Sequence, residues 1–137
     1  NVPFRLYSSA RQYEFGTFNL QPLLGFQEAL SYLRAIGFER IRERLRELTD
    51  LLLDGLRRLG ISPATPADHP GERSSIVSFT LGERNDHCYK RLSQERIFVS
   101  PRSGFLRVAV NIFNDESDIA RLLAVVKEVK GSFSILS

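Results

Sequence analysis

The chain has 137 residues, of which 42% are hydrophobic and 26% are charged, a balance typical of one folded globular domain. No apolar run reaches the ~20 residues that a bilayer-spanning helix needs, and the net charge of +3 is spread among interleaved glutamates, so we expect neither a membrane nor a nucleic-acid partner. The only cysteine, Cys88, allows no disulfide within the chain and favours a reducing, cytoplasmic setting.

Two consecutive helices are predicted in the first half of the chain. The first runs from Leu20 to Ile36, where Gly37 supplies a stop, and the second runs from Phe38 to Leu59, where Gly60 supplies another. Each carries apolar residues at spacings of three and four, which should form a buried stripe. The first stripe consists of Leu23, Phe26, Leu30 and Leu33, and the second of Phe38, Ile41, Leu45, Leu48, Leu52, Leu56 and Leu59.

The second half is predicted to form a small sheet with helices. A Pro- and Gly-rich loop over 62–73 precedes a strand over 74–81, a short helix over 86–94 and a hairpin with strands 97–99 and 105–112 around a turn at 100–104. Asn114 and Asp115 should cap a last helix that Gly131 ends. We therefore expect an α+β fold in one domain over 1–137, with two N-terminal helices before a mostly antiparallel three-stranded sheet covered by helices.

A Gly-Thr pair, Gly16 and Thr17, stands just before the first predicted helix, in the stretch Arg-Gln-Tyr-Glu-Phe-Gly-Thr-Phe-Asn from Arg11 to Asn19. Glycine allows close backbone approach, threonine offers a hydroxyl, and the free N–H groups of a helix start attract a phosphate or carboxylate. The alternative is that this segment only turns the chain and caps the helix.

A single arginine, Arg107, stands between Leu106 and Val108 in the predicted strand 105–112. Strand alternation puts its side chain on the face opposite both neighbours. Its guanidinium fork suits a bidentate contact with a carboxylate, and the alternative is an internal ion pair with a glutamate. Arg102 in the predicted turn could extend the same pocket, although a solvated turn charge is the simpler interpretation.

These two segments together, the Gly-Thr stretch and the sequence from Phe105 to Asp115, resemble the C-terminal part of the class V aminotransferase and cysteine desulfurase family. These are pyridoxal-phosphate enzymes of fold type I, and the resemblance extends over about residues 4–130, including the order of the elements. It implies that Gly16 and Thr17 contact the phosphate of pyridoxal 5'-phosphate across a homodimer interface. It also implies that Arg107 binds the α-carboxylate of an amino-acid substrate.

The resemblance covers a domain and not a whole enzyme. In the family the lysine that holds the cofactor precedes the Gly-Thr segment, whereas all three lysines here follow it, at positions 90, 127 and 130. We therefore expect the small C-terminal domain of a larger enzyme, a transferase, isomerase or lyase whose large domain is its partner, with residues 1–19 from the interdomain, cofactor-contacting region. Alone, this piece should contain no catalytic residue, be inactive and bind no cofactor.

Departures from the family favour its non-desulfurase branch, with members that resemble epimerases or aminotransferases. Cysteine desulfurases carry a cysteine on a loop that here is replaced by the short turn 100–104, which contains neither Cys nor His. Cys88 adjoins His87, but neighbouring residues on a helix point about 100° apart, which does not suit a nucleophile and its base. Two histidines and one cysteine indicate no metal site. The alternative function is a stand-alone α+β module that binds a protein or an anion without catalysis.

Overall fold

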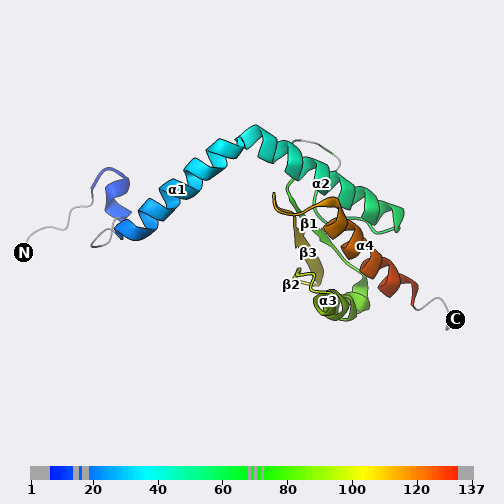
Figure 1. Cartoon of the computed structure of the whole chain (residues 1–137). Helices are drawn as coiled ribbons and strands as arrows, with labels where there is room; N and C mark the ends of the chain where they lie inside the picture. The colour runs from blue at the N-terminus through cyan, green and yellow to red at the C-terminus, as the bar shows by residue number, and fades with distance from the viewer. Residues whose placement is uncertain are drawn as a thin grey trace, which may run out of the picture. The chain divides into compact units, whose positions relative to one another are not determined.

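The computed structural model describes residues 7–13, 16, 19–67, 69, 71 and 73–132. The chain divides into two compact units, Asn1–Gly37 and Phe38–Ser137, and each is described by itself. The first unit contains a short 3-10 helix, η1 (Ala10–Tyr13), drawn in dark blue in Figure 1, and the helix α1 (Leu20–Ile36), which is labelled there.

The bounds predicted for α1 are confirmed, but its buried stripe is not. The helix ends where Gly37 adopts a φ of 96° and donates its N–H to the carbonyl of Leu33 at 3.0 Å. No residue of α1 is buried, and Leu23 and Phe26 keep 50% and 63% of their surface exposed. Helical spacing gathers apolar side chains on one side of a helix, whereas burying them takes a second apolar surface that periodicity does not report.

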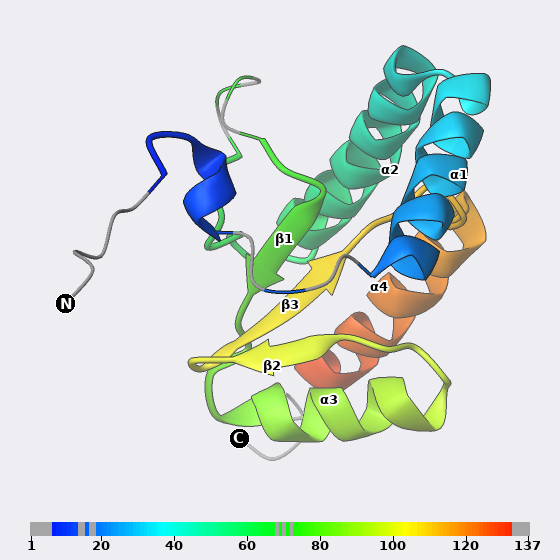
Figure 2. The same cartoon turned by 90° about the vertical axis from the view of Figure 1, so that its left-hand side faces the viewer.

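The described residues of the second unit form three α-helices and a three-stranded sheet. Its helices are α2 (Phe38–Arg58), α3 (Asn85–Gln94) and α4 (Glu116–Gly131), with the 3-10 helix η3 (Gly82–Arg84) leading into α3. Its strands are β1 (Ile76–Phe79), β2 (Ser100–Arg102) and β3 (Phe105–Ala109), all antiparallel in the order β1-β3-β2. The predicted α+β class and antiparallel sheet are therefore confirmed, and Figure 2 shows α2 and α4 on one face of the sheet.

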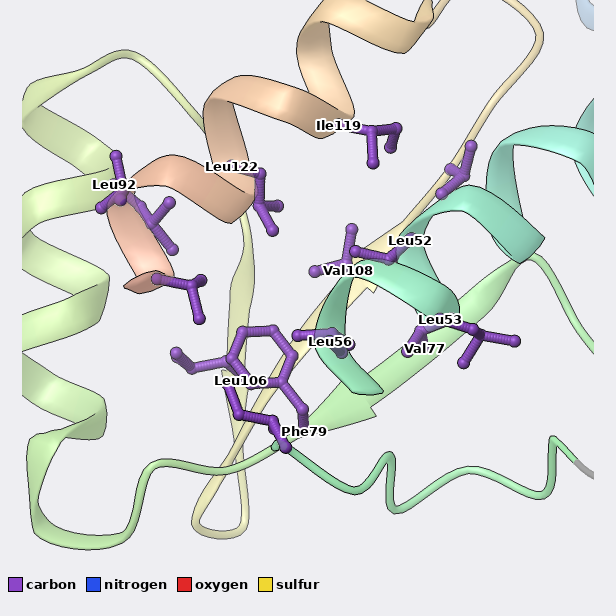
Figure 3. Close-up of a cluster of buried hydrophobic side chains, with 14 of the residues drawn as sticks. Leu52, Leu53, Leu56, Val77, Phe79, Leu92, Leu106, Val108, Ile119 and Leu122 are labelled. Carbon is purple, nitrogen blue, oxygen red and sulfur yellow. The ribbon is translucent and has the colours of Figure 1, made fainter. Parts of the chain in front are cut away.

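One hydrophobic core lies between this sheet face and the helices. Figure 3 shows the ring of Phe79 among side chains from β3, α2 and α4. Alternate residues of two strands contribute to this core: Val77 and Phe79 from β1, and Leu106 and Val108 from β3. The stripe of α2 is buried over its second half, at Leu48, Leu52 and Leu56, but Phe38 near its start is exposed.

The hairpin differs from its prediction. Residues 97–99 are not a strand, and the residues expected to form the turn form β2 instead, paired from Ser100 opposite Arg107 to Arg102 opposite Phe105. The turn contains only Ser103 and Gly104, whose φ angles of 46° and 82° are those of a type I′ turn. Pro101 indicated a turn, yet a proline is tolerated in β2 because this strand lies at the sheet edge.

Other boundaries also move. The strand predicted over 74–81 is the shorter β1, Ile76–Phe79. The strand predicted to reach residue 112 ends at Ala109, and Gly131 belongs to α4, whose C-cap is Ser132. The last turn of α4 is therefore closed by a residue with right-handed φ and ψ and not by a left-handed glycine.

Candidate functional site

The candidate site is the face of the sheet that points away from the core, which we call the open face. On β3, Leu106 and Val108 are buried toward the helices, so the half-buried Arg107 between them lies on the opposite face. The register places Ser78 of β1 and Ser100 of β2 directly beside Arg107 on either side. Arg107 is thus the central residue of a row across three strands, with a hydroxyl-bearing residue on each flank.

The strand on one side of Arg107 is held in place by the preceding loop. The N–H of Ser78 donates to Oγ1 of Thr65 at 2.9 Å, and the carbonyl of Ser78 accepts from the N–H of Ala64 at 2.7 Å. These two bonds satisfy the backbone N–H and the carbonyl of Ser78 at the outer edge of the sheet. The flank of Arg107 is therefore a fixed surface and not a loose edge.

The side chain of Arg107 forms no hydrogen bond or ion pair with any residue that the structure describes, whereas Arg44, Arg73 and Arg91 each pair with a carboxylate. The internal ion pair considered as an alternative is therefore not found in the described part of the chain. An uncompensated guanidinium in a sheet favours binding of a planar anion, since its fork offers two parallel N–H donors to a carboxylate.

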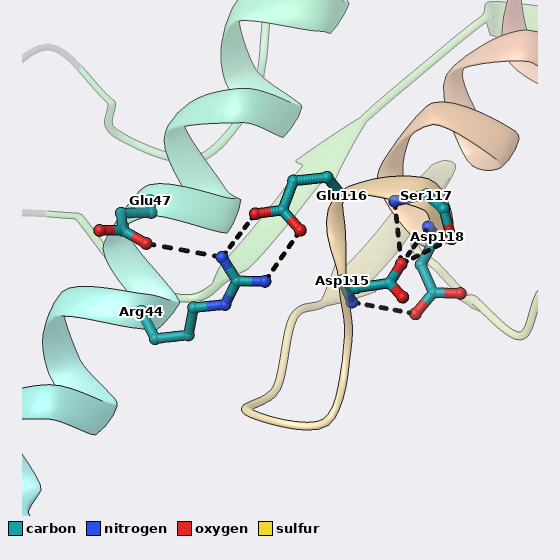
Figure 4. Close-up of polar contacts among 6 residues, drawn as sticks. All are labelled: Arg44, Glu47, Asp115, Glu116, Ser117 and Asp118. Atoms are coloured by element: carbon teal, nitrogen blue, oxygen red, sulfur yellow. Dashed lines mark hydrogen bonds and ion pairs between the residues drawn. The ribbon is translucent and has the colours of Figure 1, made fainter.

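The turn that follows β3 is braced by a network of side chains (Figure 4). Asp115 is the N-cap of α4 and accepts from the N–H groups of Ser117 and Asp118, while Asp118 accepts in return from the N–H of Asp115. The predicted cap at Asp115 is confirmed. Asn114 instead donates to Asp118 at 3.1 Å and accepts from the N–H of Asn111 at 2.9 Å.

An ion pair between helices fixes the same turn from outside. The fork of Arg44 on α2 donates to both carboxylate oxygens of Glu116, at 2.6 and 3.0 Å. This pair lowers the pKa of Glu116 to about 2, and the hydrogen bond from the Ser117 hydroxyl lowers the pKa of Asp115. The sequence did not predict this contact, because Arg44 and Glu116 are 72 positions apart and each, taken alone, looks like an ordinary solvent-exposed charge on a helix.

Gly16 adopts a left-handed backbone with a φ of 75°, and a Cβ added there would meet no atom within 4 Å. This conformation explains why residue 16 is a glycine, since residues with a side chain rarely adopt a positive φ. Asn19 precedes α1 but forms no side-chain capping bond, so the helix N-terminus keeps N–H groups for another acceptor. Thr17 lies outside the described residues, and Gly16 and Arg107 belong to different units.

Cys88 is fully buried in the core, and burial raises the pKa of its thiol to about 11. A thiol in this environment stays protonated near neutral pH and cannot be reached by a substrate, so it is no nucleophile. In the described part of the chain no group of histidine, cysteine and acidic side chains could hold a metal ion, and no helix there is long and apolar enough to cross a membrane.

Comparisons with known proteins give one family. The model of the family described as aminotransferase class-V matches residues 4–122. The chain is 32% identical over 122 residues to an uncharacterized aminotransferase of Schizosaccharomyces pombe and 35% identical over 124 residues to isopenicillin N epimerase of Amycolatopsis lactamdurans. These matches cover 89% and 83% of the chain but 30% of each relative, so the chain spans about a third of their length.

A solved structure shows the same fold. The apo structure of a cysteine desulfurase from Thermococcus onnurineus NA1 matches with a TM-score of 0.79 at 21% identity, covering 92% of this chain and 35% of that one. A probable cysteine desulfurase of Ureaplasma parvum is 27% identical over 139 residues, which cover 91% of this chain and 34% of that protein. The similarities therefore include both desulfurases and enzymes with other names.

Proposed function

The chain belongs to the class V aminotransferase family, whose members use pyridoxal phosphate, and on this premise we propose that it is the C-terminal domain of an enzyme that acts on an amino acid. The proposed substrate class follows from the uncompensated Arg107 at the centre of the open sheet face, which is the observation that carries the proposal. The large domain and a second copy of the enzyme are the proposed partners.

In this proposal Arg107 binds the substrate's α-carboxylate. The fork of the guanidinium donates two parallel hydrogen bonds to a carboxylate in one plane, so it fixes the orientation of the carboxylate as well as its position. The braced turn after β3 and the loop behind β1 hold the strand that carries Arg107, which limits the movement of the bound carboxylate. Holding this end of the substrate directs the bonds of its Cα toward the reacting groups of the enzyme.

The backbone of Gly16 and the hydroxyl of Thr17 are proposed to hold the phosphate of the cofactor. The left-handed Gly16 and the start of α1, whose Asn19 makes no side-chain cap, fit an anion, because helix N-terminal N–H groups and the helix dipole favour negative charge. When bound, pyridoxal phosphate supplies an electron sink for charge that develops at the substrate Cα. The lysine that holds it is expected in the remainder of the enzyme.

We propose the non-desulfurase branch because the segment 100–104, which stands where desulfurases carry their cysteine loop, contains no cysteine. Sulfur transfer from a cysteine substrate needs an accessible thiolate, which Cys88 does not supply because it is buried with a raised pKa. The epimerase from Amycolatopsis lactamdurans, at 35% identity, supports the same assignment.

The proposal is tested with Arg107→Gln in the full-length enzyme. Two charge-assisted hydrogen bonds contribute about 1.5–3 kcal/mol each, so their loss should raise KM for the amino acid roughly 100-fold or more. Affinity for the cofactor, followed by its absorbance, should stay unchanged because Arg107 is assigned to the substrate.

Two controls complete this test. Arg107→Lys keeps the charge but not the fork and should recover only part of the affinity. Arg58→Gln removes an exposed arginine at the end of α2 and should leave KM unchanged. A KM in Arg107→Gln equal to that of the wild type would contradict the assignment of Arg107 and the proposed function that depends on it.

A further inference from the structure

Arg102 lies beside Arg107 and not in a turn. The hairpin register pairs Arg102 with Phe105 and Ser100 with Arg107, and residues opposite each other in an antiparallel pair share a face. Arg102 therefore lies on the open face as the diagonal neighbour of Arg107. Diagonal neighbours are roughly 7–8 Å apart at their backbones, which two long side chains easily span.

The two guanidinium groups share a face without a compensating acid. The side chain of Arg102, like that of Arg107, forms no hydrogen bond or ion pair with any residue in the described part of the chain. None of the strand positions that share this face is acidic: they are Ile76, Ser78, Ser100, Arg102, Phe105, Arg107 and Ala109. Two like charges at this separation repel, and an anion bound at each would remove that cost.

We propose that Arg102 binds a second carboxylate, on the side chain of the substrate, and that the enzyme acts on a dicarboxylic amino acid. The inference rests on the proposed function, since Arg107 is assigned to the α-carboxylate of the same molecule. Phe105, 37% exposed, pairs with Arg102 and offers an apolar surface for the methylene groups between the two carboxylates. Arg102 is thus a specificity-determining residue.

The type I′ turn supports this role because it fixes where Arg102 can lie. Ser103 and Gly104 close the hairpin in two residues, so Arg102 is the last paired residue of β2 and cannot shift its register by one without moving to the other face. A longer turn, as the sequence suggested, would have left this arginine without a defined face.

The test compares acid and amide substrates that match in shape. In the full-length enzyme loaded with its cofactor, kcat/KM is measured for L-glutamate against L-glutamine and for L-aspartate against L-asparagine. The wild type should prefer an acid over its amide by at least about tenfold, since one charge-assisted bidentate contact is at stake. Binding of each compound, followed by the absorbance of the cofactor, should show the same preference without turnover.

Substitution assigns the preference to Arg102. Arg102→Gln should reduce the acid-to-amide ratio by at least about tenfold while kcat/KM for the amide stays unchanged, and Arg102→Lys should keep part of the preference. Arg58→Gln, an exposed arginine of α2, serves as the matched control for the loss of one positive charge. A ratio near one in the wild type, or a ratio unaltered in Arg102→Gln, overturns the inference.

The outcomes separate this inference from the proposed function. If Arg107→Gln raises KM for every amino acid but the wild type shows no acid preference, the α-carboxylate assignment stands and the dicarboxylic substrate is refuted. If Arg107→Gln has no effect on any amino acid, the proposed function itself fails. A strong preference for O-phospho-L-serine over both acids would replace the second carboxylate by a phosphate and also overturn the inference as stated.

Discussion

Gly55, buried on α2 where this helix meets α4, offers a sharp test of the packing behind the sheet. A Cβ at this position would overlap Cδ1 of Leu123 on α4 and lie 2.9 Å from Cδ2. The helices approach this closely because residue 55 has no side chain. Gly55→Ala therefore forces Leu123, which is partly buried, to move.

Two opposing contributions set the size of the effect. Alanine in a helix interior is favoured over glycine by about 1 kcal/mol, while overpacking a core costs about 1–3 kcal/mol. The free energy of unfolding of Gly55→Ala should therefore fall by up to about 2 kcal/mol. Leu123→Ala removes the obstructing methyl groups, and in this background the same change should raise stability by about 1 kcal/mol because only the helix preference remains.

The assay is urea unfolding of the 137-residue chain, followed by circular dichroism, for the wild type, both single variants and the double variant. The coupling free energy between the two positions should be about 1–3 kcal/mol, a range typical of residues in contact. An equal change in the free energy of unfolding on Gly55→Ala in both backgrounds would refute the argument. A Gly55→Ala single variant more stable than the wild type would also refute it. Equal m-values across the set would show that the unfolded state is comparable.

Two further predictions concern titratable groups. The Cys88 thiol should react with a disulfide reagent at pH 8 only when the chain unfolds, because burial raises its pKa to about 11; labelling of the native chain at the rate of a free thiol would contradict the buried site. The pKa of Glu116 is depressed on folding, from 4.5 to about 2, so its contribution is present above pH 4.5 and is lost as the pH falls toward 2. The free energy of unfolding should fall more steeply over this interval in the wild type than in Glu116→Gln, and identical slopes would show that the pair with Arg44 has no effect.

Local patterns predicted most of the fold because their causes are local. Helical spacing and the glycine stops gave the bounds of α1 and nearly those of α2, and the acidic residues at its start identified the cap of α4 at Asp115. The single arginine among apolar residues identified Arg107 and its face, since strand alternation depends on the chain alone. The predicted hairpin failed by a few residues because Pro101 and Gly104 both signal a turn, while pairing with β3 decides which of them forms it.

By itself, the sequence determined the α+β order of elements and the face on which Arg107 lies, because these depend on spacing along one chain, and its resemblance to known enzymes indicated the family that the comparisons show. Only the tertiary structure decided that Arg102 lies beside Arg107, that Cys88 is enclosed in the core and that Arg44 holds Glu116. These three relations join residues whose distance in space depends on strand register and helix packing. The free energies of strand pairing and helix packing arise from contacts between elements. They therefore leave no periodic pattern in the sequence of any single element.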